Sequence, residues 1–61
     1  MPIIRVELLE GRTLAQKQEL AEVLSRETAR IADCRLESIT VVIDEVKREN
    51  WAVAGKLLAQ N

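Results

Sequence analysis

The sequence contains no histidine, tyrosine or phenylalanine, and only one cysteine, one proline, one tryptophan and two glycines among its 61 residues. Without histidine, the chain lacks the side chain that most readily acts as a general base near neutral pH. Its lone cysteine, Cys34, cannot form an intrachain disulfide, and one cysteine without histidine does not make a structural zinc site. We therefore predict a protein that uses no metal and no cofactor.

The sequence also lacks a large excess of charge of either sign, and it lacks long apolar runs. The net charge is −1, with acidic and basic residues interspersed, so no basic surface for nucleic acid is expected. No apolar run approaches the ~18–20 residues that cross a bilayer, and no signal peptide is visible. The sequence predicts a cytoplasmic protein without a nucleic-acid or membrane partner.

The chain is long enough for one domain, residues 1–61, and short for a stable monomer. A chain of about 60 residues buries only about 60% of its unfolded surface, and its core rarely supplies more than ~3–5 kcal/mol. Since disulfides and metals are excluded, and 48% of the residues are hydrophobic, part of the apolar surface is expected at subunit interfaces.

Hydrophobic periodicity predicts a strand, a helix and a second strand. Residues 3–9 alternate with the period of a strand, and Gly11 permits a turn after them. Thr13 and Gln16 match a capping box, which predicts a helix over residues 14–32. An apolar stripe on that helix comprises Leu20, Leu24 and Ile31, flanked by Ala21, Thr28 and Ala32.

The second strand is predicted from Ser38 to about Val46, where β-branched residues accumulate. A polar turn at 47–50 follows. Residues 51–55 then form either a short hairpin or a strand that pairs with a neighbouring subunit, and the pattern does not place residues 56–61. This order predicts an α/β fold, a small β-α-β subunit with parallel strands, a right-handed crossover and a C-terminal hairpin. Because two strands and one helix cannot close a core, the subunit is expected to be oligomeric.

Pro2 is the best candidate for a general base. A small second residue normally allows removal of Met1, which would leave Pro2 with a free secondary amine. A model α-amino group titrates near ~7.7–8.0, and a nearby cation or partial burial lowers that pKa further. If Met1 is retained, the Pro2 nitrogen is an amide with no basic lone pair. The alternative role of Pro2 is simply to begin an edge strand.

Arg12 and Trp51 are the other candidates from the residues alone. The guanidinium of Arg12 suits a carboxylate clamp, although it could equally be a surface cation at the turn. Since seven strand residues span more than ~20 Å, Arg12 is expected to meet Pro2 only across a subunit boundary. Trp51 is either an apolar wall beside the amine or a plug in a core or interface.

Four segments of the chain resemble the 4-oxalocrotonate tautomerase family: residues 1–4 (MPII), 8–12 (LLEGR), 13–17 (TLAQK) and 41–45 (VVIDE). The resemblance implies β-α-β subunits that form dimers and homohexamers (trimers of dimers), acting on small enolic 2-oxo acids, as in the catabolism of aromatic compounds. It also implies roles for individual residues: Pro2 as catalytic base, Arg12 of an adjacent subunit as electrophilic contact, Leu9 through its backbone N–H and Ser38 as site-lining positions, and Trp51 as the aromatic that shields the proline.

Two departures from the family pattern concern the substrate site. Thr40 stands where familiar members carry a second arginine, and losing a charge-assisted hydrogen bond of roughly 1.5–3 kcal/mol costs about ten- to a hundredfold. A monocarboxylate or shorter substrate is therefore expected. Arg5 and Arg35 are the alternative cations for the role of the missing arginine, but the spacing in the sequence does not place either of them in the site. Residues 49–54 (ENWAVA) stand where relatives are richer in glycine. Because alanine disfavours positive φ, the loop beside the site is expected to differ in shape.

Two alternative functions follow from the same residues. A hydratase-like dehalogenase of the superfamily would need a glutamate just past the aromatic position, where Ala52 and Val53 stand. A non-catalytic subunit, or one subunit of a hetero-oligomer whose partner supplies the missing arginine, would agree with Thr40 and with retention of Met1.

Overall fold

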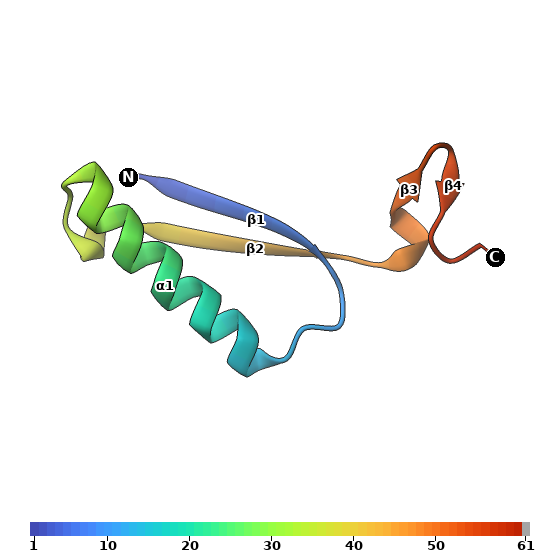
Figure 1. Cartoon of the computed structure of the whole chain (residues 1–61), viewed down its shortest axis with the longest axis horizontal. Helices are drawn as coiled ribbons and strands as arrows, with labels where there is room; N and C mark the ends of the chain where they lie inside the picture. The colour runs from blue at the N-terminus through green and yellow to red at the C-terminus, as the bar shows by residue number, and fades with distance from the viewer. Residues whose placement is uncertain (61) are drawn as a thin grey trace.

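The structure is a computed structural model, and it describes residues 1–60. Figure 1 shows a β-α-β unit followed by a small hairpin, which confirms the predicted α/β architecture. The elements in chain order are β1 (Ile3–Leu9), α1 (Leu14–Ala32), the 3₁₀ turn η1 (Leu36–Ser38), β2 (Thr40–Val46), the 3₁₀ turn η2 (Arg48–Asn50), β3 (Ala52–Val53) and β4 (Lys56–Leu57).

Strands β1 and β2 are parallel, and their register runs from Ile3 opposite Thr40 to Leu9 opposite Val46. Two backbone hydrogen bonds bracket this ladder. The Thr40 N–H donates to the Pro2 carbonyl at 3.1 Å, and the Glu10 N–H donates to the Val46 carbonyl at 2.9 Å. The register therefore holds Pro2 at the beginning of β2.

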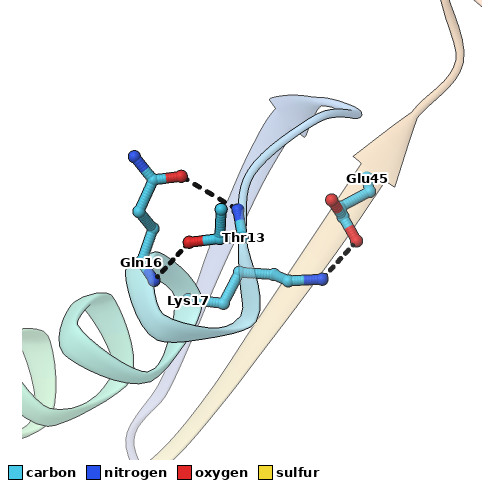
Figure 2. A network of polar contacts seen from close by, with 4 residues as sticks. All are labelled: Thr13, Gln16, Lys17 and Glu45. Carbon is cyan, nitrogen blue, oxygen red and sulfur yellow. Dashed lines mark hydrogen bonds and ion pairs between the residues drawn. The ribbon is translucent and has the colours of Figure 1, made fainter.

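Helix α1 covers one face of this pair. Lys17 of α1 donates to Glu45 of β2 at 2.8 Å (Figure 2), so Glu45 and its register partner Leu8 lie on the helix side. Side chains alternate between the faces of a strand. The helix side of β1 therefore presents Ile4, Val6 and Leu8, and its opposite side presents Ile3, Arg5, Glu7 and Leu9.

The start of α1 is capped as its sequence predicts. The Gln16 N–H donates to the Thr13 hydroxyl at 3.1 Å, and the Thr13 N–H donates to the Gln16 side-chain oxygen at 2.9 Å (Figure 2). The helix ends at Asp33, a left-handed residue with φ 53°. The predicted apolar stripe is only partly covered in the subunit. Leu20 and Leu24 are half-buried, whereas Ile31, near the helix end, is 72% exposed.

Ser38 lies outside the second strand, although the sequence pattern predicted that the strand would begin there. The Ser38 N–H donates to the Arg35 carbonyl at 3.0 Å, and the Ile39 N–H donates to the Leu36 carbonyl at 3.1 Å. Because these bonds close a 3₁₀ turn, the parallel ladder begins only at Thr40.

The C-terminal hairpin contains a strained alanine. Strands β3 and β4 pair Ala52 with Leu57 across a two-residue turn in which Ala54 has φ 54° and Gly55 has φ 80°. Two positive φ angles match the type I′ turn that fits the strand twist. Ala54 adopts a positive φ although alanine disfavours it, at a local cost of about 1–2 kcal/mol that pairing of β3 with β4 offsets.

The returning strand, Lys56–Leu57, comes from the segment that the sequence pattern did not place. The Leu58 N–H donates to the Trp51 carbonyl at 2.8 Å, and Arg48 Nη2 donates to the Leu58 carbonyl at 3.0 Å. These bonds hold the base of the hairpin against η2. Asn61, the last residue of that segment, lies outside the described residues.

The isolated subunit has no buried core. No side chain among residues 1–60 is buried, and Ile3, Leu14 and Val53 are each more than half exposed. The radius of gyration is 14.7 Å, against about 10.5 Å for a compact chain of this length. The accessible surface is 4910 Å², against about 4,000 Å² for a monomer of this mass. The subunit therefore leaves apolar surface for other subunits to cover.

No helix within residues 1–60 is both long enough and apolar enough to cross a membrane.

Candidate active site

Pro2, Ser38 and Thr40 lie together at one end of the sheet. The Thr40 N–H bonds to the Pro2 carbonyl at 3.1 Å, and the Met1 amino group donates to the Ser38 carbonyl at 2.7 Å. Pro2 and Ser38 are half-buried, whereas Thr40 is exposed. Parallel pairing therefore brings Pro2 close to Ser38 and Thr40, and backbone hydrogen bonds hold Pro2 in place.

Leu9, Arg12 and Trp51 lie toward the other end. Leu9 ends β1 opposite Val46, and Arg12 is exposed in the turn between β1 and α1. Trp51 follows η2, where its N–H donates to the Arg48 carbonyl at 3.3 Å and its side chain is half-buried. Trp51 therefore lies between η2 and β3, at the base of the hairpin. The hairpin and the N-terminus lie at opposite ends of the subunit (Figure 1).

One chain does not bring these two groups together. The seven residues of β1 separate Pro2 from the Arg12 turn, which corresponds to about 20 Å of strand. The subunit extends over 45 Å, with the N-terminus and the hairpin at opposite ends of the long axis (Figure 1). The six candidate residues therefore lie in two groups, which we call candidate half-sites: one has Pro2, Ser38 and Thr40, and the other has Leu9, Arg12 and Trp51.

The Leu9 N–H is directed away from β2. Parallel ladders use alternate residues of each strand, and the bonds at Pro2 and Glu10 place the even residues of β1 in the ladder. The N–H of Leu9 therefore points to the open edge of β1, where a ligand or another subunit can accept its hydrogen bond.

A surface groove of about 370 Å³ adjoins Arg12. Its other lining residues come from the first turns of α1: Gln16, Glu19, Leu20 and Val23. Arg12 is the only predicted site residue in this groove. The groove alone therefore does not unite the candidate residues.

The structure gives different positions to Arg5 and Arg35, the two alternative cations for the role of the missing arginine. Arg5 lies on the sheet face opposite α1, the face that also carries Thr40, because Thr40 is the register partner of Ile3. Arg35 lies before η1, is 83% exposed and contacts Glu37 at 3.8 Å. The strand register is the signal that separates them, and it is not visible in the sequence alone.

Among residues 1–60, no three histidine, cysteine, aspartate or glutamate side chains are gathered as a group that could hold an ion. Cys34 is half-buried and has a free thiol.

Sequence relatives agree with this architecture. A family model described as "Tautomerase enzyme" matches residues 2–61. The 2-hydroxymuconate tautomerase of Bacillus subtilis (strain 168) is 39% identical over 59 residues, which cover 97% of this chain and 95% of that protein. The chain belongs to the 4-oxalocrotonate tautomerase family. It is therefore an enzyme of the isomerase class.

Solved structures of the tautomerase family share the whole subunit fold. A crystal structure of a 4-oxalocrotonate tautomerase homologue superposes with a TM-score of 0.96 at 34% identity, covering 100% of this chain and 97% of that one. A 4-oxalocrotonate tautomerase from Chloroflexus aurantiacus J-10-fl, described as a heterohexamer, has a TM-score of 0.90 at 38% identity, covering 98% and 97%. The β-α-β unit and the hairpin are therefore the family's subunit.

Proposed function

We propose that this tautomerase-family chain moves a proton in enolic or dienolic 2-oxo acids, with the Pro2 amine as general base. The observation that carries the proposal is the division of the candidate residues into two half-sites on one extended subunit. Pro2 belongs to one half-site, and Arg12 and Trp51 belong to the other. A second subunit in contact with the first can complete both.

In the proposed reaction, the neutral Pro2 nitrogen removes the proton of the enol hydroxyl. The oxygen electron pair forms the carbonyl, the carbon–carbon double bond shifts, and the Pro2 ammonium returns a proton to carbon. Arg12 of a neighbouring subunit stabilises the negative charge on the enolate and carboxylate oxygens. Trp51 excludes water, which keeps the amine neutral.

Oligomerisation is part of the proposal. A homohexamer built as a trimer of dimers would cover the exposed apolar side chains and join the half-sites. The absence of any buried side chain among residues 1–60 supports a subunit that is not self-sufficient.

The first test is the intact mass of the purified protein with its native start. A mass lacking one methionine leaves Pro2 with a free amine, as the proposed chemistry requires. Retention of Met1 would leave an amide nitrogen and exclude Pro2 as base.

The second test measures tautomerisation of phenylenolpyruvate by the clipped protein. Pro2→Ala, which leaves a primary amine of different geometry, and Arg12→Ala should each lower kcat/KM by at least about tenfold. Unchanged activity in both variants would reject this mechanism.

A second arrangement is a hetero-oligomer whose partner supplies a catalytic or binding residue. The similarity to a chain of the Chloroflexus aurantiacus heterohexamer favours it. A second polypeptide of similar size, co-purifying from the native source in a fixed ratio, would support mixed assembly. Full activity of a single purified polypeptide would argue against it.

A further inference from the structure

We propose that Arg5 is a specificity-determining residue that binds a second anionic group of the substrate. This inference rests on the proposed function, because it assigns part of the substrate to the Pro2 half-site. It differs from the monocarboxylate expectation drawn from Thr40, since Arg5 supplies a cation on the same sheet face.

The register places Arg5 close to Thr40 and on the same side of the sheet. Ile3 pairs with Thr40, and Arg5 pairs with Val42. Partners in a parallel ladder share a face, so Arg5 and Thr40 are diagonal neighbours. The spacing between strands and the rise along them put their Cα atoms roughly 8 Å apart, within reach of a long side chain.

Arg5 is also close to the proposed base. Arg5 lies three positions after Pro2 along an extended chain, which corresponds to about 10 Å between their Cα atoms. The Arg5 side chain can cover much of this separation. An extended substrate with its reacting carbon at Pro2 and its other end along β1 would therefore present that end to the guanidinium.

The Arg5 side chain is exposed on the sheet. Among residues 1–60, no carboxylate oxygen lies within 4.0 Å of its guanidinium. Glu7 and Asp44 lie further along the same face, opposite each other in the register. The other nearby candidate, Arg35, contacts Glu37. Arg5 is thus the cation on this face that is available to a ligand.

The test compares a dicarboxylate with a monocarboxylate. 2-Hydroxymuconate and phenylenolpyruvate serve as the two enol acids for the wild type and for Arg5→Gln. We expect kcat/KM for the dicarboxylate to fall about 10- to 100-fold, mainly through KM, because a charge-assisted hydrogen bond is lost. Activity on the monocarboxylate should stay within about threefold of wild type.

Three further variants separate binding from a structural effect. Arg26→Gln removes an exposed cation on α1 (67% exposed) and should leave both activities unchanged. Arg5→Lys should recover part of the dicarboxylate activity. Thr40→Arg, added to Arg5→Gln, should restore it, because position 40 lies on the same face. Equal losses on both substrates, or a dicarboxylate kcat/KM within about threefold of wild type in Arg5→Gln, would overturn the inference.

A binding measurement separates failure of this inference from failure of the proposed function. Calorimetry with adipate and hexanoate, neither of which can tautomerise, should show a preference for adipate that disappears in Arg5→Gln. That result in a protein inactive on both enol acids would uphold the Arg5 site and reject the proposed function. A wild type that converts phenylenolpyruvate but neither converts nor binds dicarboxylates would reject the Arg5 site alone.

Discussion

The N–H of Thr40 donates a hydrogen bond to the carbonyl oxygen of Pro2 at 3.1 Å. This bond begins the parallel ladder and places the second residue of the chain beside the first residue of β2. Because only backbone atoms take part, the side chain at position 40 can change without moving Pro2. The seven residues of β1 carry Arg12 to the opposite end of the sheet, so the register positions Pro2 and the length of β1 separates it from Arg12.

Mixing two impaired variants should restore activity if the site spans two subunits. Pro2→Ala and Arg12→Ala proteins, denatured together in equal amounts and refolded, should recover about a quarter of wild-type activity, because random assembly into a symmetric oligomer gives that share of intact sites. The activity of each variant refolded alone is subtracted.

Native mass spectrometry of the same sample checks that mixed oligomers have formed. If mixed oligomers are present and the activity equals only the sum of the two parents, Pro2 and Arg12 do not share a site between neighbouring chains.

Ala54→Gly should stabilise the protein. Ala54 has φ 54° in the hairpin turn, a conformation that glycine adopts without the steric cost of a Cβ atom. We expect a gain of about 1 kcal/mol, measured as a higher midpoint of thermal unfolding at fixed protein concentration. Ala52→Gly, within β3, is the matched control and should lower the midpoint. A decrease in both variants would contradict strain at Ala54.

Thr13→Ala should destabilise the protein by about 1 kcal/mol, because the Thr13 hydroxyl accepts the Gln16 N–H at the start of α1. Denaturant unfolding monitored by circular dichroism measures the change. Gln18→Ala, at an exposed position of the same helix, should change stability by less than about 0.5 kcal/mol. Equal effects of the two substitutions would show that the cap contributes nothing measurable.

Lys17 and Glu45 should be coupled, and weakly. Their side chains meet at 2.8 Å and are 27% and 31% exposed (Figure 2). A double-mutant cycle with Lys17→Met and Glu45→Gln should give a coupling of about 0.2–1 kcal/mol that decreases in high salt. A coupling that is independent of salt would point to packing of the lysine methylenes instead of charge.

Local patterns were sufficient for most of the subunit. Alternation in residues 3–9 predicts β1, and Thr13 with Gln16 marks the helix start that the structure confirms. The sequence pattern did not predict the turn at Ser38 or the positive φ of Ala54, for different reasons. At Ser38, turn bonds compete with a strand that is locally favourable. At Ala54, pairing of β3 with β4 compensates for a backbone angle that alanine disfavours.

The sequence by itself determined the β-α-β order and the helix cap, and it marked Pro2 and Arg12 as candidate residues, because these depend on residue type and on contacts between near neighbours. Only the tertiary structure decided the strand register. The register depends on pairing between residues nearly forty positions apart, and no local pattern encodes it. It places Thr40 beside Ile3 at the Pro2 end of the sheet, and it brings Arg5 to the same face as Thr40.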